Sequence, residues 1–376
     1  MLKQPSFTFG VEEEYHLVDL QTRDLAPAPP QLMEACAARL GSRVSPEMLK
    51  SQIEIGTGVC GDFRAARAEV AELRREVAKL ARDYGLAPIA AGTHPFARWS
   101  ELETTDKERY QMLERDLAIV GRRLVISGMH VHVGIEDPEL RIEIMNQVRY
   151  FLPHLLVLST SSPFWQGHDT GLKSFRLSVG LGSPRSGLPG RFSGWDEYQR
   201  TVDVLVGAGV IEDSSKIWWD IRPSARFPTL EMRITDVMPR IDDAMTVAAL
   251  YVCLCRMLYR MRRCNLSWRT YPVFLLEENR WRAQRYGTRD SLIDFGKGSL
   301  VPIRDLFAEI LDLVREDADA LGCRREVEGA MRILDAGTSA DRQVETYKAA
   351  LAKGASEEEA LRAVVDQLVA ETVSDL

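Results

Sequence analysis

Polar residues recur two positions apart in three otherwise apolar runs of this sequence, and this spacing restricts the fold more than any other feature. The runs read FTFGVEEEYHLV, LVISGMHVHVGI and FPTLEMRITDV. Because side chains alternate between the two faces of a β-strand, residues two positions apart point the same way, about 6 to 7 Å from one another. The spacing therefore predicts three strands, each with an apolar face for packing and a polar face.

The polar faces of these strands carry residues that bind cations and anions. The pairs that share a face are Glu12 with Glu14, His130 with His132, and Glu231 with Arg233. Glu13 points to the opposite face. A fourth strand-like run, KSQIEIGTG, places Glu54 between two isoleucines, where a buried carboxylate needs a cation or hydrogen-bond donors. One such run is also typical of a strand with a solvated face, but four runs together predict a shared site.

A cluster of carboxylates with one or two imidazoles is the donor set of a hard divalent cation. Such a site suits Mg²⁺ or Mn²⁺, which accept phosphate and water as further ligands, better than it suits zinc. Arg233 would oppose an all-protein metal site but fits a site shared with an anionic phosphate. The chain has neither G-x-x-x-x-G-K-[ST] nor G-x-G-x-x-G after a strand. These features predict phosphoryl transfer without a P-loop or a dinucleotide-binding turn.

Strand-like and helix-like segments divide the chain into two parts. Residues 1–240 alternate short strands with amphipathic helices, and residues 241–376 are predicted to be helices joined by short turns. We predict an α+β fold in which both parts form a single domain over residues 1–376. Three helix starts are marked by the capping residues Asp62, Asp137 and Ser356. The glycine-rich segment from Gly182 to Gly194 is predicted to be a mobile loop.

Composition and charge exclude several classes of function. The net charge is −7 and basic residues are interspersed with acidic ones, so no nucleic-acid surface is expected. The apolar segment from Ala244 to Tyr259 is interrupted by Arg256 and is shorter than the roughly 20 residues of a bilayer span, which predicts a buried helix and no membrane partner. The six cysteines lack CxxC spacing, and no export signal is visible. We expect a cytoplasmic protein with reduced cysteines, and a homodimer in which the 244–259 helix is partly interfacial.

Several motifs resemble those of a known enzyme family. GVEEE is similar to the GxExE opening of glutamate–cysteine ligases, SGMHVH to their metal-histidine strand, and LEMR to a late strand with a glutamate and an arginine. KIWWDIRPSARFPTLEMRITD, ENRWRAQRYG and GTSADRQ resemble the YbdK-type carboxylate–amine ligases of glutamate–cysteine ligase type 2 in particular. The similarity covers nearly the whole chain, and the KIWWDIRPS run is specific.

The resemblance implies a glutamine-synthetase-like fold, in which a curved, mainly antiparallel sheet with outer helices encloses a funnel for ATP, divalent metals and substrate. The metal ligands that it implies are Glu12, Glu14, Glu54, His130 and Glu231. Glu231 and Arg233 would be the catalytic residues, with Arg233 as a clamp for the γ-phosphate or acyl phosphate. Arg176 would bind the carboxylate substrate. Lys216 and Arg222 line up with the branch motif and would contact nucleotide phosphates.

Other residues keep two interpretations. His94, in the Gly/Pro-flanked loop GTHPF, is either a substrate contact or a structural residue. His132 is either functional or a hydrogen-bonded core histidine. The polar residues of ENRWRAQRYG, among them Asn279, fit both a functional role and a solvated helix face.

The activity that the resemblance implies is ATP-dependent coupling of a small-molecule carboxylic acid to an amine through an acyl phosphate. A weak glutamate–cysteine ligase activity is implied as well, but the sequence selects neither the acid nor the amine. Two other functions use the same residues: a divalent-metal-dependent amide hydrolase, and a non-catalytic nucleotide-binding protein on the same scaffold. The intact acidic residues and Arg233 favour an enzyme, and a requirement for ATP distinguishes the ligase from the hydrolase.

Overall fold

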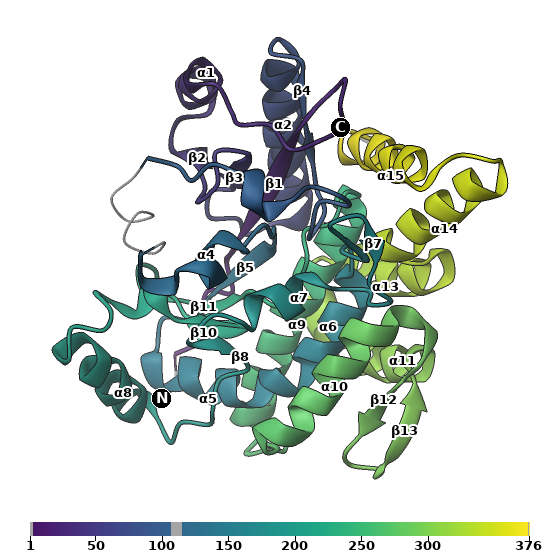
Figure 1. Ribbon diagram of the computed structural model, residues 1–376. Coiled ribbons are helices and arrows are strands. Elements are labelled where there is room, and N and C mark those ends of the chain that lie inside the picture. Colours follow the sequence, from purple (N-terminus) through teal and green to yellow (C-terminus); the bar gives the residue numbers. More distant parts are fainter. Residues whose placement is uncertain (1–2, 107–114, 375) are drawn as a thin grey trace.

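An antiparallel sheet forms the part of the fold that carries the polar residues. The computed structural model describes residues 3–106, 115–374 and 376. Within these residues, seven strands form one sheet in the order β10-β11-β5-β1-β3-β2, and β4 also pairs with β1 (Figure 1). The strands are β1 (Phe9–Asp19), β2 (Val44–Pro46), β3 (Gln52–Gly56), β4 (Leu86–Ile89), β5 (Met129–Gly134), β10 (Ile221–Pro223) and β11 (Thr229–Met232). All of their pairings are antiparallel, as expected.

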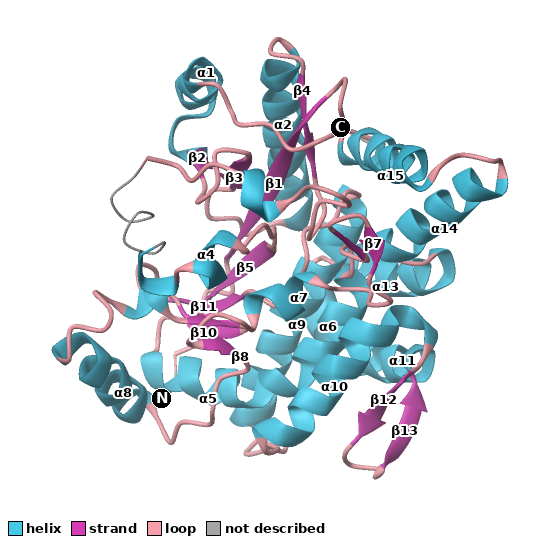
Figure 2. Ribbon diagram, viewed as in Figure 1, coloured by secondary structure: helices cyan, strands magenta, loops and turns pink. Residues whose placement is uncertain are grey.

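Helices make up most of the remaining chain (Figure 2). They are α1 (Pro30–Leu40), α2 (Phe63–Arg82), α4 (Ile119–Arg122), α5 (Pro138–Val148), α6 (Leu152–Ser159), α7 (Arg176–Gly180), α8 (Trp195–Gly207), α9 (Ile241–Arg263), α10 (Val273–Tyr286), α11 (Ile303–Leu313), α12 (Arg315–Ala320), α13 (Arg324–Ala336), α14 (Ser339–Ala352) and α15 (Glu357–Thr372). The predicted α+β fold with a mainly helical C-terminal part is confirmed. That part also contains a hairpin of β12 (Ser291–Asp294) and β13 (Ser299–Pro302), which the sequence did not predict.

Local sequence signals explain where several elements begin. The side chains of Asp62 and Asp137 accept a backbone N–H in the first turn of α2 and α5, and Ser356 forms a capping box at the start of α15, so the predicted helix starts are confirmed. The predicted loop from Gly182 to Gly194 contains β8 (Ser186–Gly187), which pairs in parallel with β9 (Trp218–Trp219). Two further short strands, β6 (Phe164–Trp165) and β7 (His168–Asp169), also pair.

The long apolar helix α9 lies in the hydrophobic core, as predicted. Nearly all of its residues from Ile241 to Tyr259 are buried, and it contacts α13, α6, α2 and β5. The core around it includes residues from both parts of the chain. Since its apolar residues are covered by the chain itself, the expectation that this helix is partly a dimer interface is wrong. Among the helices that the structure describes, none has the length and apolar character of a membrane span.

Glu13 confirms the predicted orientation of side chains along β1. It is fully buried, and its carboxylate accepts hydrogen bonds from Nε and Nη2 of Arg74, at 2.9 and 2.6 Å. The Tyr15 hydroxyl donates to the same carboxylate. Arg74 comes from α2 and is also fully buried. This ion pair joins α2 to the sheet, on the face opposite to Glu12 and Glu14.

Candidate active site

The register of the sheet brings the predicted polar residues together on one face. The cross-strand partners are Glu12 and His130, Glu14 and Glu54, His132 and Glu231, and Arg222 and Glu231. Side chains of directly opposed residues on one face are neighbours, about 5 Å apart at their Cβ atoms. All of these residues line one cavity of about 510 Å³. Arg233 follows the last residue of β11, and its N–H still continues the sheet by donating to the Asp220 carbonyl at 2.8 Å.

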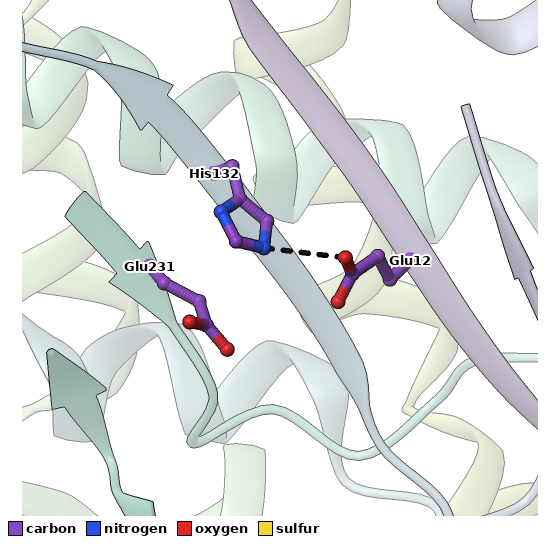
Figure 3. Close-up of side chains that lie close together, drawn as sticks. All are labelled: Glu12, His132 and Glu231. Atoms are coloured by element: carbon purple, nitrogen blue, oxygen red, sulfur yellow. Dashed lines mark ion pairs between the residues drawn. The ribbon is translucent and has the colours of Figure 1, made fainter. Parts of the chain in front are cut away.

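The first group of potential metal ligands, here called the histidine cluster, consists of Glu12, His132 and Glu231 from three neighbouring strands (Figure 3). One ligand atom from each lies within 4.8 Å of the others. Glu12 Oε1 is 3.4 Å from His132 Nε2, and His132 Nδ1 is hydrogen-bonded to the Thr229 hydroxyl at 2.9 Å. The Nε2 atom is buried, and among the described residues its polar neighbour is the Glu12 carboxylate, so both atoms point to the place where a cation would be ligated. His132, which the sequence left open, therefore lies in the site.

The second group, here called the carboxylate cluster, consists of Glu14, Glu47 and Glu54, with one oxygen from each within 4.8 Å of the others. Burial raises the pKa of Glu54 well above its ordinary value, and the negative charges of Glu47, Glu12 and Glu14 raise it further. A divalent cation between these oxygens would offset their repulsion. Sequence reasoning missed Glu47, which follows β2 in the loop before β3, where no strand alternation marks it.

His130 lies between the two clusters. Its Nδ1 is 3.3 Å from Glu12 Oε2, and its Nε2 is 3.8 Å from Glu14 Oε1. Burial and the neighbouring Arg233 charge lower the pKa of His130, so its imidazole is neutral at pH 7 and keeps a lone pair for a cation. The structure thus places this predicted ligand next to both clusters, but in neither three-residue group.

Two arginines hold Glu231. Arg222 Nε and Nη2 donate to its two oxygens at 2.9 and 3.2 Å, and Arg233 Nη1 donates to the same carboxylate. Burial alone would raise the pKa of Glu231, but the charges of Arg233 and Arg222 lower it well below its ordinary value. Arg222 also donates through Nη1 to the carbonyls of Ser215 and Ile217, so all three of its nitrogens are used within the chain. The Arg233 side chain remains 19% exposed, toward the cavity.

Two further predicted cationic residues line the same cavity. Arg176, at the start of α7, donates through Nη1 and Nη2 to the carbonyls of Ile234 and Arg233 at 3.2 and 3.1 Å. Lys216 ends a short 3-10 turn at residues 214–216, and its Nζ is 3.7 Å from a Glu212 oxygen. The structure therefore brings both residues to the cavity that contains the two clusters.

His94 does not line that cavity. Its Nδ1 accepts the backbone N–H groups of Phe96 and Ala97 at 3.2 and 2.9 Å, and its Nε2 is 2.9 Å from the Arg23 carbonyl. Burial lowers the pKa of His94 to about 4, so the ring is neutral at pH 7. With both ring nitrogens bound to backbone groups, His94 has the contacts of a structural residue, and the structure favours that interpretation over a substrate contact.

Helix α10 supplies a residue that sequence reasoning missed. Arg280 reaches from α10 to Asp220, with 2.6 Å between Nε and Oδ2, and both residues line the cavity. The adjacent Asn279 is buried, and its side chain bonds to the backbone N–H and carbonyl of Ile293 at 2.7 and 2.8 Å. The solvated-face interpretation is therefore wrong for Asn279. Nothing in ENRWRAQRYG distinguishes Arg280 from the neighbouring arginines.

Comparisons with known proteins concern the family and the fold of the chain. The model of the glutamate-cysteine ligase family 2 matches residues 8–367. A Rhodospirillum rubrum protein named "Putative glutamate--cysteine ligase 2" is 57% identical over 380 residues, which cover 100% of this chain and 98% of the relative. The crystal structure of a glutamate–cysteine ligase from Francisella tularensis in complex with AMP has a TM-score of 0.72 at 14% identity, covering 99% of this chain and 90% of that one. A bifunctional glutathione synthetase from Pasteurella multocida has a TM-score of 0.69 at 14% identity, covering 98% of this chain and 53% of that one.

The structural likeness shows that the fold is the one found in glutamate–cysteine ligases. The sequence similarity extends over the whole chain, including the strands and α10 that form the cavity. The family that the motifs resembled is thus confirmed: the chain belongs to glutamate–cysteine ligase family 2.

Proposed function

We propose that this protein is an ATP-dependent carboxylate–amine ligase that joins an acid to an amine through an acyl phosphate. Its family membership confirms the predicted ligase class. The observation that carries the proposal is that the histidine cluster, the carboxylate cluster and Arg233 share one cavity. Arginine beside so many carboxylates fits an anionic phosphoryl group that lies between them, which a simple amide hydrolase does not require.

The two clusters are the proposed binding sites for divalent cations, Mg²⁺ or Mn²⁺. Carboxylates and imidazole are the donors that these cations accept, and the crowding of Glu14, Glu47 and Glu54 supports a bound positive charge. His130 and Nε2 of His132, which both lie next to Glu12, would supply the nitrogen donors. Bound cations would offset the negative charge of the ATP phosphates during transfer.

Side chains of the cavity position the substrates in this proposal. Arg176 binds a carboxylate of the acid, and Lys216 contacts nucleotide phosphates. Arg222 acts through Glu231, which it holds in place, because its own nitrogens are used within the chain. Arg233 stabilises the negative charge that develops on the transferred phosphoryl group.

The proposed reaction has two steps. A carboxylate oxygen of the acid attacks the γ-phosphorus of ATP, the bond to the bridging β-phosphate oxygen breaks, and ADP leaves. The amine nitrogen then attacks the acyl carbon, the bond from that carbon to the phosphate oxygen breaks, and inorganic phosphate leaves while the nitrogen loses a proton. We propose L-glutamate and L-cysteine as the first acid and amine to test, because relatives of this chain are named for that pair.

Heavy-oxygen labelling of the acid tests this reaction. If the acid carries ¹⁸O in its carboxylate, one labelled oxygen should appear in inorganic phosphate, because that oxygen bridges carbon and phosphorus in the acyl phosphate. Arg233→Ala should lower this transfer about 10²-fold or more, as removal of other charge-stabilising groups does. Label in AMP would indicate an acyl adenylate, and amide turnover without ATP would indicate the hydrolase. Undiminished transfer in Arg233→Ala would contradict the role assigned to that residue.

The single domain, the homodimer and the cytoplasmic location stay predictions. Limited proteolysis tests the first, analytical ultracentrifugation the second, and cell fractionation the third.

A further inference from the structure

Arg176 has a buried guanidinium group that is only partly satisfied by the chain. Its Nη1 and Nη2 donate to the backbone carbonyls of Ile234 and Arg233, whereas its Nε is buried without a hydrogen-bond partner among the described residues. The side chain is 9% exposed and lines the cavity. Carbonyl oxygens carry no net charge, so these contacts fix the guanidinium without neutralising it. A buried positive charge of this kind needs a counter-ion nearby.

Asp236 is that counter-ion, but its oxygens are already occupied by other donors. One carboxylate oxygen, Oδ2, accepts the backbone N–H of Ser161 at 2.9 Å and the hydroxyl of Ser162 at 2.7 Å. The other, Oδ1, accepts the hydroxyl of Ser174 at 2.8 Å and lies 3.8 Å from Arg176 Nη1. At 3.8 Å the two groups attract each other without a hydrogen bond. Asp236 therefore stabilises the arginine charge without accepting a hydrogen bond from Arg176.

The surroundings fix the distance between the two side chains. The Ser162 hydroxyl that donates to Asp236 also accepts the backbone N–H of Arg176, at 3.1 Å. A Cβ atom added at Gly92 would lie 2.8 Å from Asp236 Cγ, and one added at Gly128 would overlap Arg176 Nη2. Both side chains thus pass against glycines, where any larger residue would displace them.

We propose that Asp236 is a positioning residue, which compensates the buried charge of Arg176 and keeps its guanidinium group oriented for a carboxylate of the acid substrate. The inference rests on the proposed ligase function. In it, Asp236 never touches the substrate. Its charge makes a buried cation tolerable, and the three donors from Ser161, Ser162 and Ser174 keep it from closing onto Arg176 and competing with the substrate carboxylate.

Kinetics of Asp236→Asn test the proposal with L-glutamate, L-cysteine and Mg²⁺-ATP as probes. The KM for L-glutamate should rise about tenfold or more, as expected when a charge-assisted contact is weakened, while the KM for ATP stays within about twofold of wild type. Ser174→Ala and Gly128→Ala should also raise the KM for L-glutamate. The first removes a hydrogen-bond donor to Asp236, and the second places a methyl group against the Arg176 guanidinium. The matched control is Asp317→Asn, since Asp317 is a fully buried carboxylate held by Arg256 and Arg260, outside the cavity.

The control separates a positioning role from a general loss of stability. Asp317→Asn should lower the unfolding midpoint without changing either KM. Equal rises in the KM for L-glutamate and for ATP in Asp236→Asn, or an unchanged KM for L-glutamate in Asp236→Asn, would overturn the proposal. If Asp236→Asn does not fold, the KM values of Ser174→Ala and Gly128→Ala are measured instead, and the same two outcomes in these variants would overturn the proposal.

A second measurement requires no turnover, so it distinguishes a failure of this inference from a failure of the proposed function. Unfolding midpoints are compared for Asp236→Asn, Arg176→Met and the double variant. Removing Asp236 leaves the Arg176 charge buried and uncompensated, so removing both should lower the midpoint by less than the sum of the single shifts. Additive shifts would show that the two residues are not coupled. A wild-type protein that consumes no ATP with any acid would instead refute the ligase function and leave this coupling measurable.

Discussion

Replacement of Glu13 by glutamine should destabilise the protein and leave its chemistry intact. Glu13 and Arg74 form an ion pair in which both side chains are 0% exposed. In glutamine, one carboxylate oxygen is replaced by an NH₂ group, which cannot accept a hydrogen bond. The Arg74 guanidinium therefore loses its counter-ion and at least one hydrogen bond. Removing one partner of a buried ion pair costs about 3 to 5 kcal/mol. We expect the free energy of unfolding to fall by this amount.

The neighbouring replacement, Glu12→Gln, should have the opposite profile. Glu12 lies one position away on the cavity face, its side chain is 30% exposed, and it belongs to the crowded histidine cluster. Loss of its charge should lower the free energy of unfolding by less than the Glu13 replacement does, because the Glu12 side chain is partly exposed and is not paired with an arginine. It should lower ligase activity about 10²-fold or more, because a charge-stabilising group is removed from the reaction site.

Denaturant unfolding and kinetics on the same protein samples test this pair. Free energies of unfolding are compared at equal m values, and activity is measured where every variant is folded. The double variant Glu13→Gln/Arg74→Met should recover part of the lost stability, because it removes the uncompensated charge. Wild-type stability of Glu13→Gln, or a stability loss of the same size in Glu12→Gln, would refute the assignment of the two faces of β1.

Two further predictions concern pH and metal. The pKa of His94 is about 4 in the folded protein, against an ordinary value of 6.5, so folding disfavours its protonation and the stabilisation is lost as pH falls from 6.5 toward 4. Within this range, His94 should lower the free energy of unfolding by about 1.4 kcal/mol for each pH unit of acidification. Denaturant unfolding at several pH values measures this dependence, and His94→Asn should remove the contribution of His94 to it. Mg²⁺ should raise the unfolding midpoint of the wild type, and Glu54→Gln should reduce this shift whereas the exposed control Glu328→Gln should not. An unchanged slope, or equal Mg²⁺ shifts in both glutamate variants, would contradict these assignments.

Strand alternation predicted much of the candidate site because it depends only on local geometry. Once a segment is a strand, residues two apart share a face whatever its neighbours are. Glu12 and Glu14 could therefore be assigned to one face of β1 before its pairing with β3 was known, and the register then placed Glu54 opposite Glu14. The histidines of β5 follow the same rule. The antiparallel register then placed these faces side by side, as the motifs implied.

Residues outside the strands had no such rule. Glu47 lies in the loop between β2 and β3. Arg280 reaches the cavity from a helix sixty positions after Asp220, and Asp236 contacts serines more than sixty positions earlier in the chain. Such contacts are set by the tertiary path of the chain, which periodicity does not encode. His94 shows a different limit, since its Gly/Pro-rich loop fitted both a substrate contact and a structural role, and only the structure shows that both ring nitrogens contact nearby backbone groups.

The two faces of β1 differ in how their charges are compensated, and this difference is a better guide to function than the presence of charge. Glu13 is buried more deeply than Glu12 or Glu14, yet Arg74 neutralises it one to one. On the cavity face, no lysine or arginine among the described residues forms an ion pair with a member of the carboxylate cluster. Charges held close together without a partner destabilise the fold, so their persistence requires a compensating interaction. The core around α9 packs on the other side of the sheet from these carboxylates, so it does not supply that interaction. In the proposed function, the compensating charge is a divalent cation bound together with ATP.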